Sequence, residues 1–346
     1  MTRSLTDLLG IEVPIVLGPF GGLSSVALTA AVSDGGGLGS FGLYGYDATR
    51  IRETVDLLRA ATARPFALNL WLPTGDEVTP AEADIVPTRD ALASLFRAAG
   101  VEPPEPPSRF LPPLEEQLDA VWDAAPAALS VVFGVPPVDV VDEAHRRGIR
   151  VIGTATSVAE AVALADGGVD AIVASGSEAA GHRVTFRARP EDSLVGTFAL
   201  VPQVVDAVDV PVIAAGGVAD RRGVAAALAL GAQGVQVGTA FLRTRQSAAS
   251  DGHREAISRA RDTDTVLTRA MSGRLARGIP NRAIREIEAL GAIAPFPAQN
   301  WLTGVFRAAA GGDPDLSSLW AGQAAALAVH DDAAAVLTEL IAGLPR

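Results

Sequence analysis

The sequence predicts an α/β fold, a (β/α)8 TIM barrel with a smaller helical cap domain. Three observations support this prediction: eight short apolar runs occur along the chain, Ala-rich helical stretches alternate with them, and two long excursions interrupt the alternation. The runs are apolar at successive positions, as in residues 171–174 and 212–215. Strands covered by a barrel interior on one side and by helices on the other have this composition.

The eight predicted strands occupy the apolar runs in chain order. They are residues 14–17, 37–43, 65–72, 129–135, 150–154, 170–175, 210–215 and 234–237. The helical stretches between them include residues 25–33, 49–61, 138–147, 158–165, 196–208 and 222–230. Eight βα units favour a closed barrel. An open doubly wound sheet is the alternative if one of these runs is not a strand.

Two segments do not fit the repeat and are predicted to form the cap. Residues 73–126 contain two proline-rich runs, and residues 243–315 are polar and mostly helical in pattern. Long excursions from a compact barrel are usually lids or second lobes. We therefore expect two domains, with residues 316–344 supplying the eighth barrel helix. The barrel is predicted at 1–75, 123–243 and 316–346, and the helical lid at 76–122 and 244–315.

Composition and charge exclude several classes of protein. The 28 basic and 40 acidic residues give a net charge of −12, which argues against nucleic acid or an acidic membrane as partner. The absence of Cys excludes disulfides, Cys-ligated metals and thiol nucleophiles. The absence of Lys excludes Schiff-base aldolases and P-loop NTPases. Because no signal-peptide core or long apolar stretch occurs, we expect a cytoplasmic protein without a membrane partner.

Glycines follow the last two predicted strands. Ala215, Gly216 and Gly217 end the seventh strand, and Gly238 with Thr239 follows the eighth. Glycine lets the backbone approach a ligand closely and expose its N–H groups. In barrels, the loops after strands seven and eight commonly form a phosphate site. Each cluster alone would fit an ordinary strand end, but the two together indicate a ligand that carries a phosphate.

The loop after the sixth strand carries the strongest candidate for acid–base chemistry. Residues 175–183 read SGSEAAGHR, and His182 stands where a barrel places its catalytic loops. An imidazole can accept a proton near neutral pH, and Glu178 is the fallback base. Because only Glu178 lies at ligand spacing from His182, we expect no metal site. The other three histidines lie among charged residues and are interpreted as solvated: His145, His253 and His330.

Further residues at the carboxyl ends of strands indicate contact with a ligand. Asn69 and Gln236 are polar amides within apolar strands, where they need hydrogen-bonding partners. The edge of a cofactor ring offers such partners, and so does the backbone. The charged stretch 274–285 is interpreted as solvated lobe surface. A close-approach loop follows the first strand: Gly18, Pro19, Phe20 and Gly21.

Taken in order, these residues resemble the nitronate monooxygenase family of FMN-dependent barrel enzymes. The resemblance covers nearly the whole chain. It departs from many relatives at Ser175, where they carry Gln, and at Val184, where they carry Gly. The matching stretches are residues 14–22, 30–33, 36–39, 69–70, 178–182, 200–205, 211–217, 236–242, 272–274, 276–278 and 320–323.

The resemblance implies roles for these residues. His182 would be the catalytic base, and Asn69 would lie near the isoalloxazine ring of FMN. Loops at the ends of the strands would hold the cofactor. The full set of expected FMN-binding residues is Gly18, Pro19, Phe20, Gly21, Asn69, Ser175, Ala180, Gly181, Ala215, Gly216, Gly217, Gln236, Val237, Gly238 and Thr239.

The implied activity is oxidation of alkyl nitronates with O2 to carbonyl compounds and nitrite. Neutral nitroalkanes would be substrates where His182 removes their α-proton. The partners would be the nitronate and O2, and the chain would be a monomer or homodimer. One alternative is an FMN-dependent enoyl-acyl carrier protein reductase or another flavin oxidoreductase of the same barrel family. Another is a flavin-free phosphosugar isomerase or lyase, whereas the position of His182 disfavours a non-catalytic binding barrel.

Overall fold

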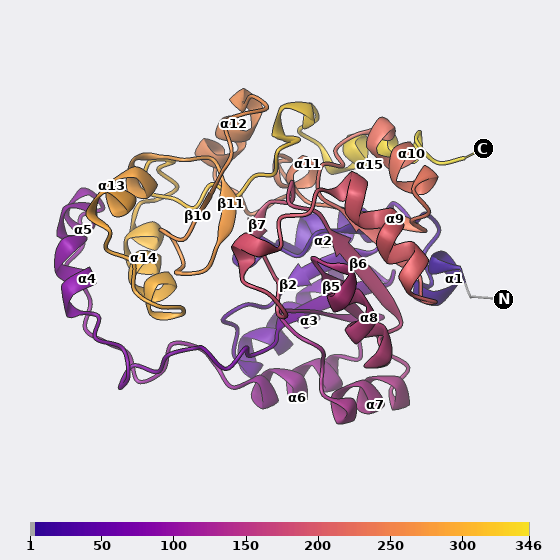
Figure 1. Cartoon of the computed structure of the whole chain (residues 1–346), viewed down its shortest axis with the longest axis horizontal. Coiled ribbons are helices and arrows are strands. Elements are labelled where there is room, and N and C mark those ends of the chain that lie inside the picture. Colours follow the sequence, from indigo (N-terminus) through magenta and orange to yellow (C-terminus); the bar gives the residue numbers. More distant parts are fainter. Residues whose placement is uncertain (1–3, 346) are drawn as a thin grey trace.

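The computed structural model describes residues 4–345, in which a barrel adjoins a second lobe (Figure 1). The outermost residues of the expected barrel, 1–3 and 346, lie outside the described residues. Eight parallel strands form one sheet in the order β1-β9-β8-β6-β5-β4-β3-β2. Their bounds are β1 Ile15–Leu17, β2 Gly39–Gly42, β3 Phe66–Trp71, β4 Ala128–Val132, β5 Arg150–Ala155, β6 Ala171–Ser175, β8 Val212–Ala215 and β9 Gly234–Val237.

The sheet closes on itself between β1 and β2. Val16 pairs with Leu38 in a parallel bridge just before β2 begins. Backbone hydrogen bonds reinforce this bridge: Leu17 N donates to Leu38 O at 2.9 Å, and Leu38 N donates to Ile15 O at 2.9 Å. This closure confirms the predicted (β/α)8 barrel.

Helices cover the outside of the barrel. Ser25, Asp47 and Asp220 begin three of them by accepting hydrogen bonds from backbone N–H groups of the first turn. A Cβ at Gly153 of β5 would lie 2.6 Å from Leu164 Cδ2, so this glycine lets α8 pack directly on the strand. The outer helices are α2 Val26–Asp34, α3 Ala48–Ala61, α6 Leu114–Ala124, α7 Val138–Arg146, α8 Val158–Asp166, α9 Thr197–Ala207, α10 Arg221–Ala229 and α15 Ala333–Ile341.

The amino-terminal end of the barrel is plugged. Helix α1 (Leu5–Leu9) lies there, and Leu5 N donates to Gln233 Oε1, just before β9, at 3.1 Å. Leu5 and Leu9 belong to a buried hydrophobic cluster with Ile152 and Ile213 of the barrel strands. Because this end is filled, a ligand of the barrel has access only from the carboxyl ends of the strands, where barrel enzymes bind ligands.

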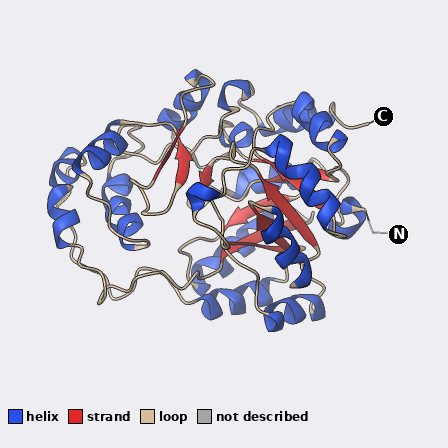
Figure 2. Ribbon diagram, in the orientation of Figure 1, coloured by secondary structure: helices blue, strands red, loops and turns tan. Residues whose placement is uncertain are grey.

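The second lobe has its own hydrophobic cluster, which includes Phe96, Met271, Ile287 and Phe306. Its helices are α4 Val86–Ala91, α5 Ala93–Ala98, α13 Arg282–Leu290 and α14 Ala298–Ala309. A three-stranded antiparallel sheet joins the lobe to the barrel, in the order β10 (Val266–Thr268), β11 (Ala276–Gly278) and β7 (Gly181–His182) (Figure 2). The cap is mostly helical, as expected, and these short strands are added to its helices. These strands have only two or three residues, too few for an alternating pattern.

Helix α6 packs on the barrel rather than on the lobe. Its buried residues Leu118 and Val121 belong to the hydrophobic cluster of the barrel, and the helix contacts α3. The expected lid range 76–122 includes most of this helix. The amphipathic pattern of α6 shows that one face is buried but does not show against which partner.

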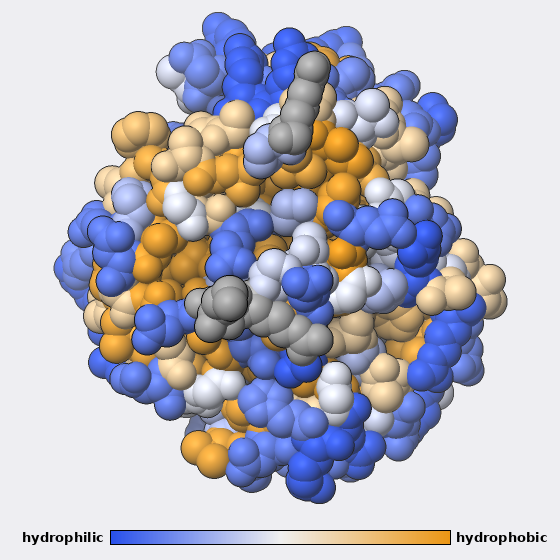
Figure 3. All heavy atoms as spheres, turned by 90° about the vertical axis from the view of Figure 1, so that its right-hand side faces the viewer, coloured by the Kyte–Doolittle hydropathy of each residue, from blue (hydrophilic) through white to orange (hydrophobic). Residues whose placement is uncertain are grey.

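The remaining helices are short or lie at the junction of barrel and lobe. They are α11 Thr239–Leu242, α12 Asp251–Arg259 and the 3-10 helices η1 Pro190–Asp192 and η2 Ala325–Leu327. Within residues 4–345, no helix combines the length and apolar character needed to cross a membrane. On the barrel face turned away from the lobe, hydrophobic patches lie between hydrophilic residues (Figure 3).

Candidate active site

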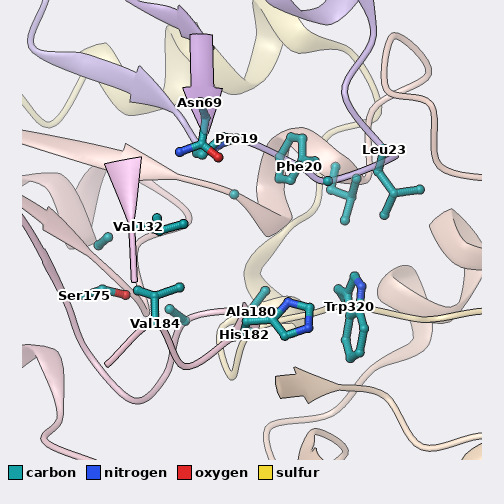
Figure 4. Close-up of a pocket in the computed structure, with 18 of the residues that line it drawn as sticks. Pro19, Phe20, Leu23, Asn69, Val132, Ser175, Ala180, His182, Val184 and Trp320 are labelled. Atoms are coloured by element: carbon teal, nitrogen blue, oxygen red, sulfur yellow. The ribbon is translucent and has the colours of Figure 1, made fainter. Parts of the chain in front are cut away.

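A cavity of about 370 Å³ opens at the carboxyl ends of the barrel strands, between the barrel and the second lobe (Figure 4). Residues from both parts line it. Of the residues predicted for the site, those that line the cavity are Gly18, Pro19, Phe20, Gly21, Asn69, Ser175, Ala180, Gly181, His182, Ala215, Gly216, Gly217, Gln236, Gly238 and Thr239.

Val237 is the exception among the predicted residues. Side chains alternate between the two faces of a strand, so Val237 points away from the face shared by Gln236. Its side chain is fully buried in the hydrophobic cluster between strands and helices. Val237 therefore does not line the cavity, and its place among the FMN-binding residues stays a prediction.

The glycine loops after β8 and β9 expose backbone donors. Gly216 and Gly217 have φ of +98° and +75°, which L side chains rarely adopt. A Cβ at Gly216 would lie 2.8 Å from Thr197 Oγ1 and 3.2 Å from Ala179 N. Within residues 4–345, the N–H groups of Gly216, Gly217 and Gly238 donate to no other residue. Such a row of unused donors is an anion-binding arrangement.

Polar side chains on the barrel strands are available to a ligand. Asn69 Nδ2 donates to Ser130 Oγ at 2.9 Å and to Ser130 O at 3.2 Å, so its nitrogen is used inside the barrel. Its Oδ1 accepts no hydrogen bond from the described part of the chain, and neither the Gln236 amide nor the Ser175 hydroxyl has a partner there. Because all three residues line the cavity, these groups can bond to a ligand.

His182 lies on β7 and is held by the lobe. His182 pairs with Ala276 of β11. The backbone N–H of Arg183, the next residue, donates to Leu275 O at 2.8 Å. The imidazole packs edge-on against Trp71, with ring centroids 4.9 Å apart, and lies 5.5 Å from the Trp320 ring. The ring therefore stands in an aromatic environment at the cavity wall.

Ser272 engages the Nε2 nitrogen of His182. Ser272 Oγ lies 2.8 Å from His182 Nε2 and donates to Arg274 O at 3.1 Å. The Ser272 hydroxyl has one hydrogen. When it donates that hydrogen to the Arg274 carbonyl, its oxygen accepts from the imidazole, and the ring hydrogen of His182 is on Nε2. Nδ1 then keeps its lone pair, and it has no partner among the described residues.

Burial keeps the His182 ring neutral. Desolvation, together with the positive charges of Arg274 and Arg307, lowers its pKa from 6.5 to about 3. At neutral pH the ring is therefore an uncharged hydrogen-bonding group with a free lone pair. Proton transfer to it becomes favourable when negative charge develops beside it.

The carboxylate of Glu178, the fallback base of the sequence analysis, is engaged by Thr197. Its carboxylate accepts hydrogen bonds from Thr197 N at 2.9 and 3.0 Å and from Thr197 Oγ1 at 2.9 Å. These donors stand at the first turn of α9, where a negative charge is favourable. Glu178 thus fixes the loop before His182 to the barrel.

A second carboxylate, which is buried, fixes the loop after His182. Glu160 is fully buried and accepts hydrogen bonds from Thr185 Oγ1 at 2.6 Å and Phe186 N at 2.7 Å. Arg183, also buried, donates to Gly176 O at 2.7 Å and Ser193 O at 2.8 Å. Burial lowers the Arg183 pKa to about 10, and the charge of Glu160 opposes that effect. The segment that carries His182 is therefore held on both sides.

A family model described as nitronate monooxygenase matches residues 2–344. The chain belongs to the nitronate monooxygenase family. A probable nitronate monooxygenase of Staphylococcus aureus is 40% identical to it over 97% of this chain and 96% of that protein. Membership makes the chain an oxidoreductase and confirms the resemblance described above.

Solved structures support the same assignment. The nitroalkane oxidase of Streptomyces ansochromogenes has a TM-score of 0.87 at 35% identity, over 98% of this chain and 97% of that one. FabK from Thermotoga maritima has a TM-score of 0.76 at 30% identity, over 99% of this chain and 96% of that one. The whole architecture, lobe included, is thus shared with these proteins.

In this member of the nitronate monooxygenase family, the lobe adds cavity residues that sequence reasoning missed. Phe296, Asn300 and Arg307 line the cavity, together with Tyr44 of the barrel. Asn300 Nδ2 donates to Tyr44 Oη at 3.0 Å, and burial raises the pKa of Tyr44 to about 12. Tyr44 is therefore a neutral phenol. Nothing in the sequence around these residues separates them from ordinary helix and loop positions.

Arg274 corrects the interpretation of residues 274–285 as solvated. Its guanidinium lies 3.9 Å from the Phe296 ring centroid and bonds to Asp76 at 2.8 Å and Glu77 at 2.7 Å. Arg277 is also buried and donates to Ser177 O at 2.9 Å. Composition alone suggested solvent, but these arginines have carboxylate, carbonyl or aromatic partners inside the protein. Asn281 is buried too, whereas Arg282 and Arg285 are exposed.

The histidines outside the cavity differ from one another. His145 is at the surface, as expected, and bonds to Asp170 at 2.9 Å. His330 is half-buried. His253 was expected at the surface because of its charged neighbours, but it is buried and bonds through Nε2 to Trp320 O at 3.0 Å. Helix α12 turns this side chain inward while Asp251 faces solvent.

A second cavity of about 230 Å³ lies beside the first. Tyr44, Trp71 and Phe296 line both cavities. The Tyr44 and Trp71 ring centroids are 4.4 Å apart, so these aromatic side chains form the wall between the two spaces.

Proposed function

We propose that the chain is an FMN-dependent nitronate monooxygenase, which oxidises alkyl nitronates with O2 to carbonyl compounds and nitrite. His182 is the general base that extends this activity to neutral nitroalkanes. The single observation that carries the proposal is His182 in the cavity of a chain of this family, neutral and with Nδ1 unbonded.

The cavity fits FMN. The unused N–H groups of Gly216, Gly217 and Gly238 are suited to its phosphate, without any Lys. Asn69, Ser175 and Gln236 present polar groups suited to the edge of its ring system. Bound FMN would accept electrons from the nitronate and, once reduced, react with O2. Ser175 is shorter than the Gln of many relatives, and its hydroxyl still lines the cavity.

His182 would take the α-proton of a neutral nitroalkane at Nδ1. The C–H bond breaks, its electron pair moves onto the nitro group, and the resulting nitronate lies beside the imidazolium. This new anion offsets the low pKa that burial gives the ring. Ser272 keeps Nε2 engaged, so the ring presents Nδ1 throughout.

We further propose that residues 76–122 and 244–315 act as a lid that excludes water from the site. Phe296, Asn300 and Arg307 support this role, because they lie in the second segment and line the cavity. Helix α6 within the first segment packs on the barrel and would stay fixed.

Aerobic release of nitrite from a panel of alkyl nitronates tests the proposed function. We expect the purified protein to carry flavin absorbance near 450 nm and to release nitrite with consumption of O2. Oxidation of NADPH with an enoyl thioester, without nitrite release from any nitronate, would instead indicate an enoyl reductase. A colourless protein that binds no FMN would contradict the cofactor assignment.

A further inference from the structure

Arg307 is a cation of the cavity that has no carboxylate partner. Its Nη2 donates to Asn300 Oδ1 at 2.8 Å and to Asn300 O at 3.0 Å, and its Nη1 donates to Ser318 Oγ at 3.2 Å. Its Nε is buried and bonds to nothing in the described chain. All three of its acceptors are neutral, and no ion pair involves Arg307 within residues 4–345.

Other arginines near the cavity differ in how their charge is neutralised. Arg274 has both Asp76 and Glu77 within 2.8 Å. Arg50 lines the cavity too, but its side chain is exposed and stacks on the Tyr46 ring at 3.7 Å, where water screens its charge. Among the arginines that line the cavity, Arg307 is thus distinguished by being half-buried, with a fully buried Nε and without a counter-charge, which is unfavourable until an anion is present.

The groups around Arg307 do not supply that anion. Tyr44, which Asn300 links to Arg307, keeps its proton because burial raises its pKa to about 12. His182 is neutral. Glu178 also lines the cavity, but Thr197 satisfies its carboxylate at the start of α9. The part of the cavity between His182 and Arg307 therefore has an uncompensated positive charge.

We propose that Arg307 is the anion-selecting residue of the cavity, which attracts the negatively charged head group of the substrate and makes the site prefer anions over neutral compounds. This inference rests on the proposed function only in naming the anion as an alkyl nitronate. Small planar oxyanions such as nitrate share its charge and shape and would bind at the same place. Asn300 already engages both Nη2 hydrogens and Ser318 one Nη1 hydrogen, so Arg307 would attract such ligands by its charge and its remaining Nη1 hydrogen.

The test compares Arg307→Gln with Arg307→Lys and Arg52→Gln. Arg52 lies on the barrel surface, paired with Asp123, so Arg52→Gln removes the same formal charge away from the cavity. Arg307→Gln should raise the KM for a nitronate about 10- to 100-fold. It should leave the KM for the corresponding neutral nitroalkane within about twofold, because that substrate has no charge to lose. Arg307→Lys should restore most of the affinity, and Arg52→Gln should match the wild type.

A binding measurement makes the test independent of turnover. Isothermal titration calorimetry with sodium nitrate, at constant ionic strength, should show binding to the wild type and about 10- to 100-fold weaker binding to Arg307→Gln. Arg307→Met, which keeps the apolar stem, is the second variant if the Gln variant does not fold. All variants are checked for flavin content.

The outcomes separate the two proposals. Equal changes of KM for nitronate and nitroalkane, or unchanged nitrate binding in Arg307→Gln, would overturn the role of Arg307. Loss of flavin from Arg307→Gln would also overturn it, because the residue would then serve the cofactor. If the wild type releases no nitrite from any nitronate but loses nitrate binding on mutation, the proposed function fails and the anion-selecting role stands.

Discussion

At the scale of single residues, burial and nearby charge would set the chemistry of the proposed base, His182. A half-buried ring between two indoles, with arginines nearby, resists becoming an imidazolium. The same arginines favour a nitronate over its conjugate acid. The cavity would therefore stabilise the deprotonated substrate more than the protonated base, which suits the proposed preference for an anion.

His182→Asn should reduce turnover of a neutral nitroalkane by about 10²–10⁴-fold while flavin stays bound. Asn cannot accept the proton, but its amide still fits between the aromatic rings. A preformed nitronate should lose less, because it needs no deprotonation. Steady-state nitrite release from both substrates measures the difference, and equal small losses on the two would mean that His182 is not the base.

Gly216→Asp and Gly238→Asp should each give a protein without flavin colour. Both place a carboxylate beside the N–H groups proposed for the phosphate, and Gly216 also has a φ of +98°. Gly148→Asp is the matched control, since Gly148 has a φ of +74° and open space around its missing Cβ, at the end of α7. Retention of stoichiometric flavin by both cavity variants, measured by absorbance, would refute the phosphate assignment.

Sequence reasoning found the site residues that follow barrel strands and missed those that reach it from elsewhere. Gly216, Gly238 and His182 stand at strand ends, where position alone suggests a role. Arg307 lies on a helix of the lobe, and its place at the cavity depends on how that lobe packs. His253 shows the converse, because charged neighbours in sequence say nothing about the direction of a side chain on a helix.

At the scale of elements, carboxylates hold the short segments around β7, and the most buried of them is Glu160. Glu160 lies in the first turn of α8, where the backbone also favours a negative charge. It accepts hydrogen bonds from Thr156, Thr185, Phe186 and Arg187. One side chain therefore ties the loop after His182 to the barrel wall.

Glu160→Gln should lower the free energy of unfolding by about 3 kcal/mol. The amide NH2 would face donors of the loop, and the nearby buried Arg183 would lose a compensating charge. Asp123→Asn is the control, because it removes a carboxylate from an exposed pair with Arg52 and should cost less than about 1 kcal/mol. Urea unfolding of both variants checks the prediction, and equal losses would show that the Glu160 network does not stabilise the fold.

Elements with a long pattern were predictable, and short ones were not. The eight barrel strands stand out as apolar runs between helices. The strands β7, β10 and β11 have two or three residues each, and their pairing comes from the contact between barrel and lobe. No local pattern encodes that contact.

At the scale of the whole molecule, buried neutral histidines make stability depend on pH. Burial lowers the pKa of His253 from 6.5 to about 4. Between these two values the unfolded chain binds more protons than the folded one, so the free energy of unfolding falls as the pH drops below about 6.5. The stabilisation by the neutral ring is complete above that pH.

His253→Gln should weaken this acid sensitivity. The Gln amide keeps a donor for Trp320 O but cannot be protonated in this range. The pKa shift from 6.5 to about 4 corresponds to a loss on the order of 3 kcal/mol at pH 4 in the wild type. Urea unfolding at pH 4 to 8 should therefore show a shallower pH dependence for the variant, whereas parallel curves would refute the role of His253.

The pairing of β7 with β11 also limits how this protein can be recombined with its relatives. His182 lies on one strand of that pair, and its partner Ser272 lies four residues before the other strand begins. A chimera that exchanged the lobe but kept the barrel loops would join a base from one parent to a hydrogen-bonding partner from another. Crossover points outside both segments would transfer them together. The paired strands β7 and β11 thus connect the proposed base to its hydrogen-bonding partner across the barrel and the lobe. Shuffling experiments should transfer the two strands together.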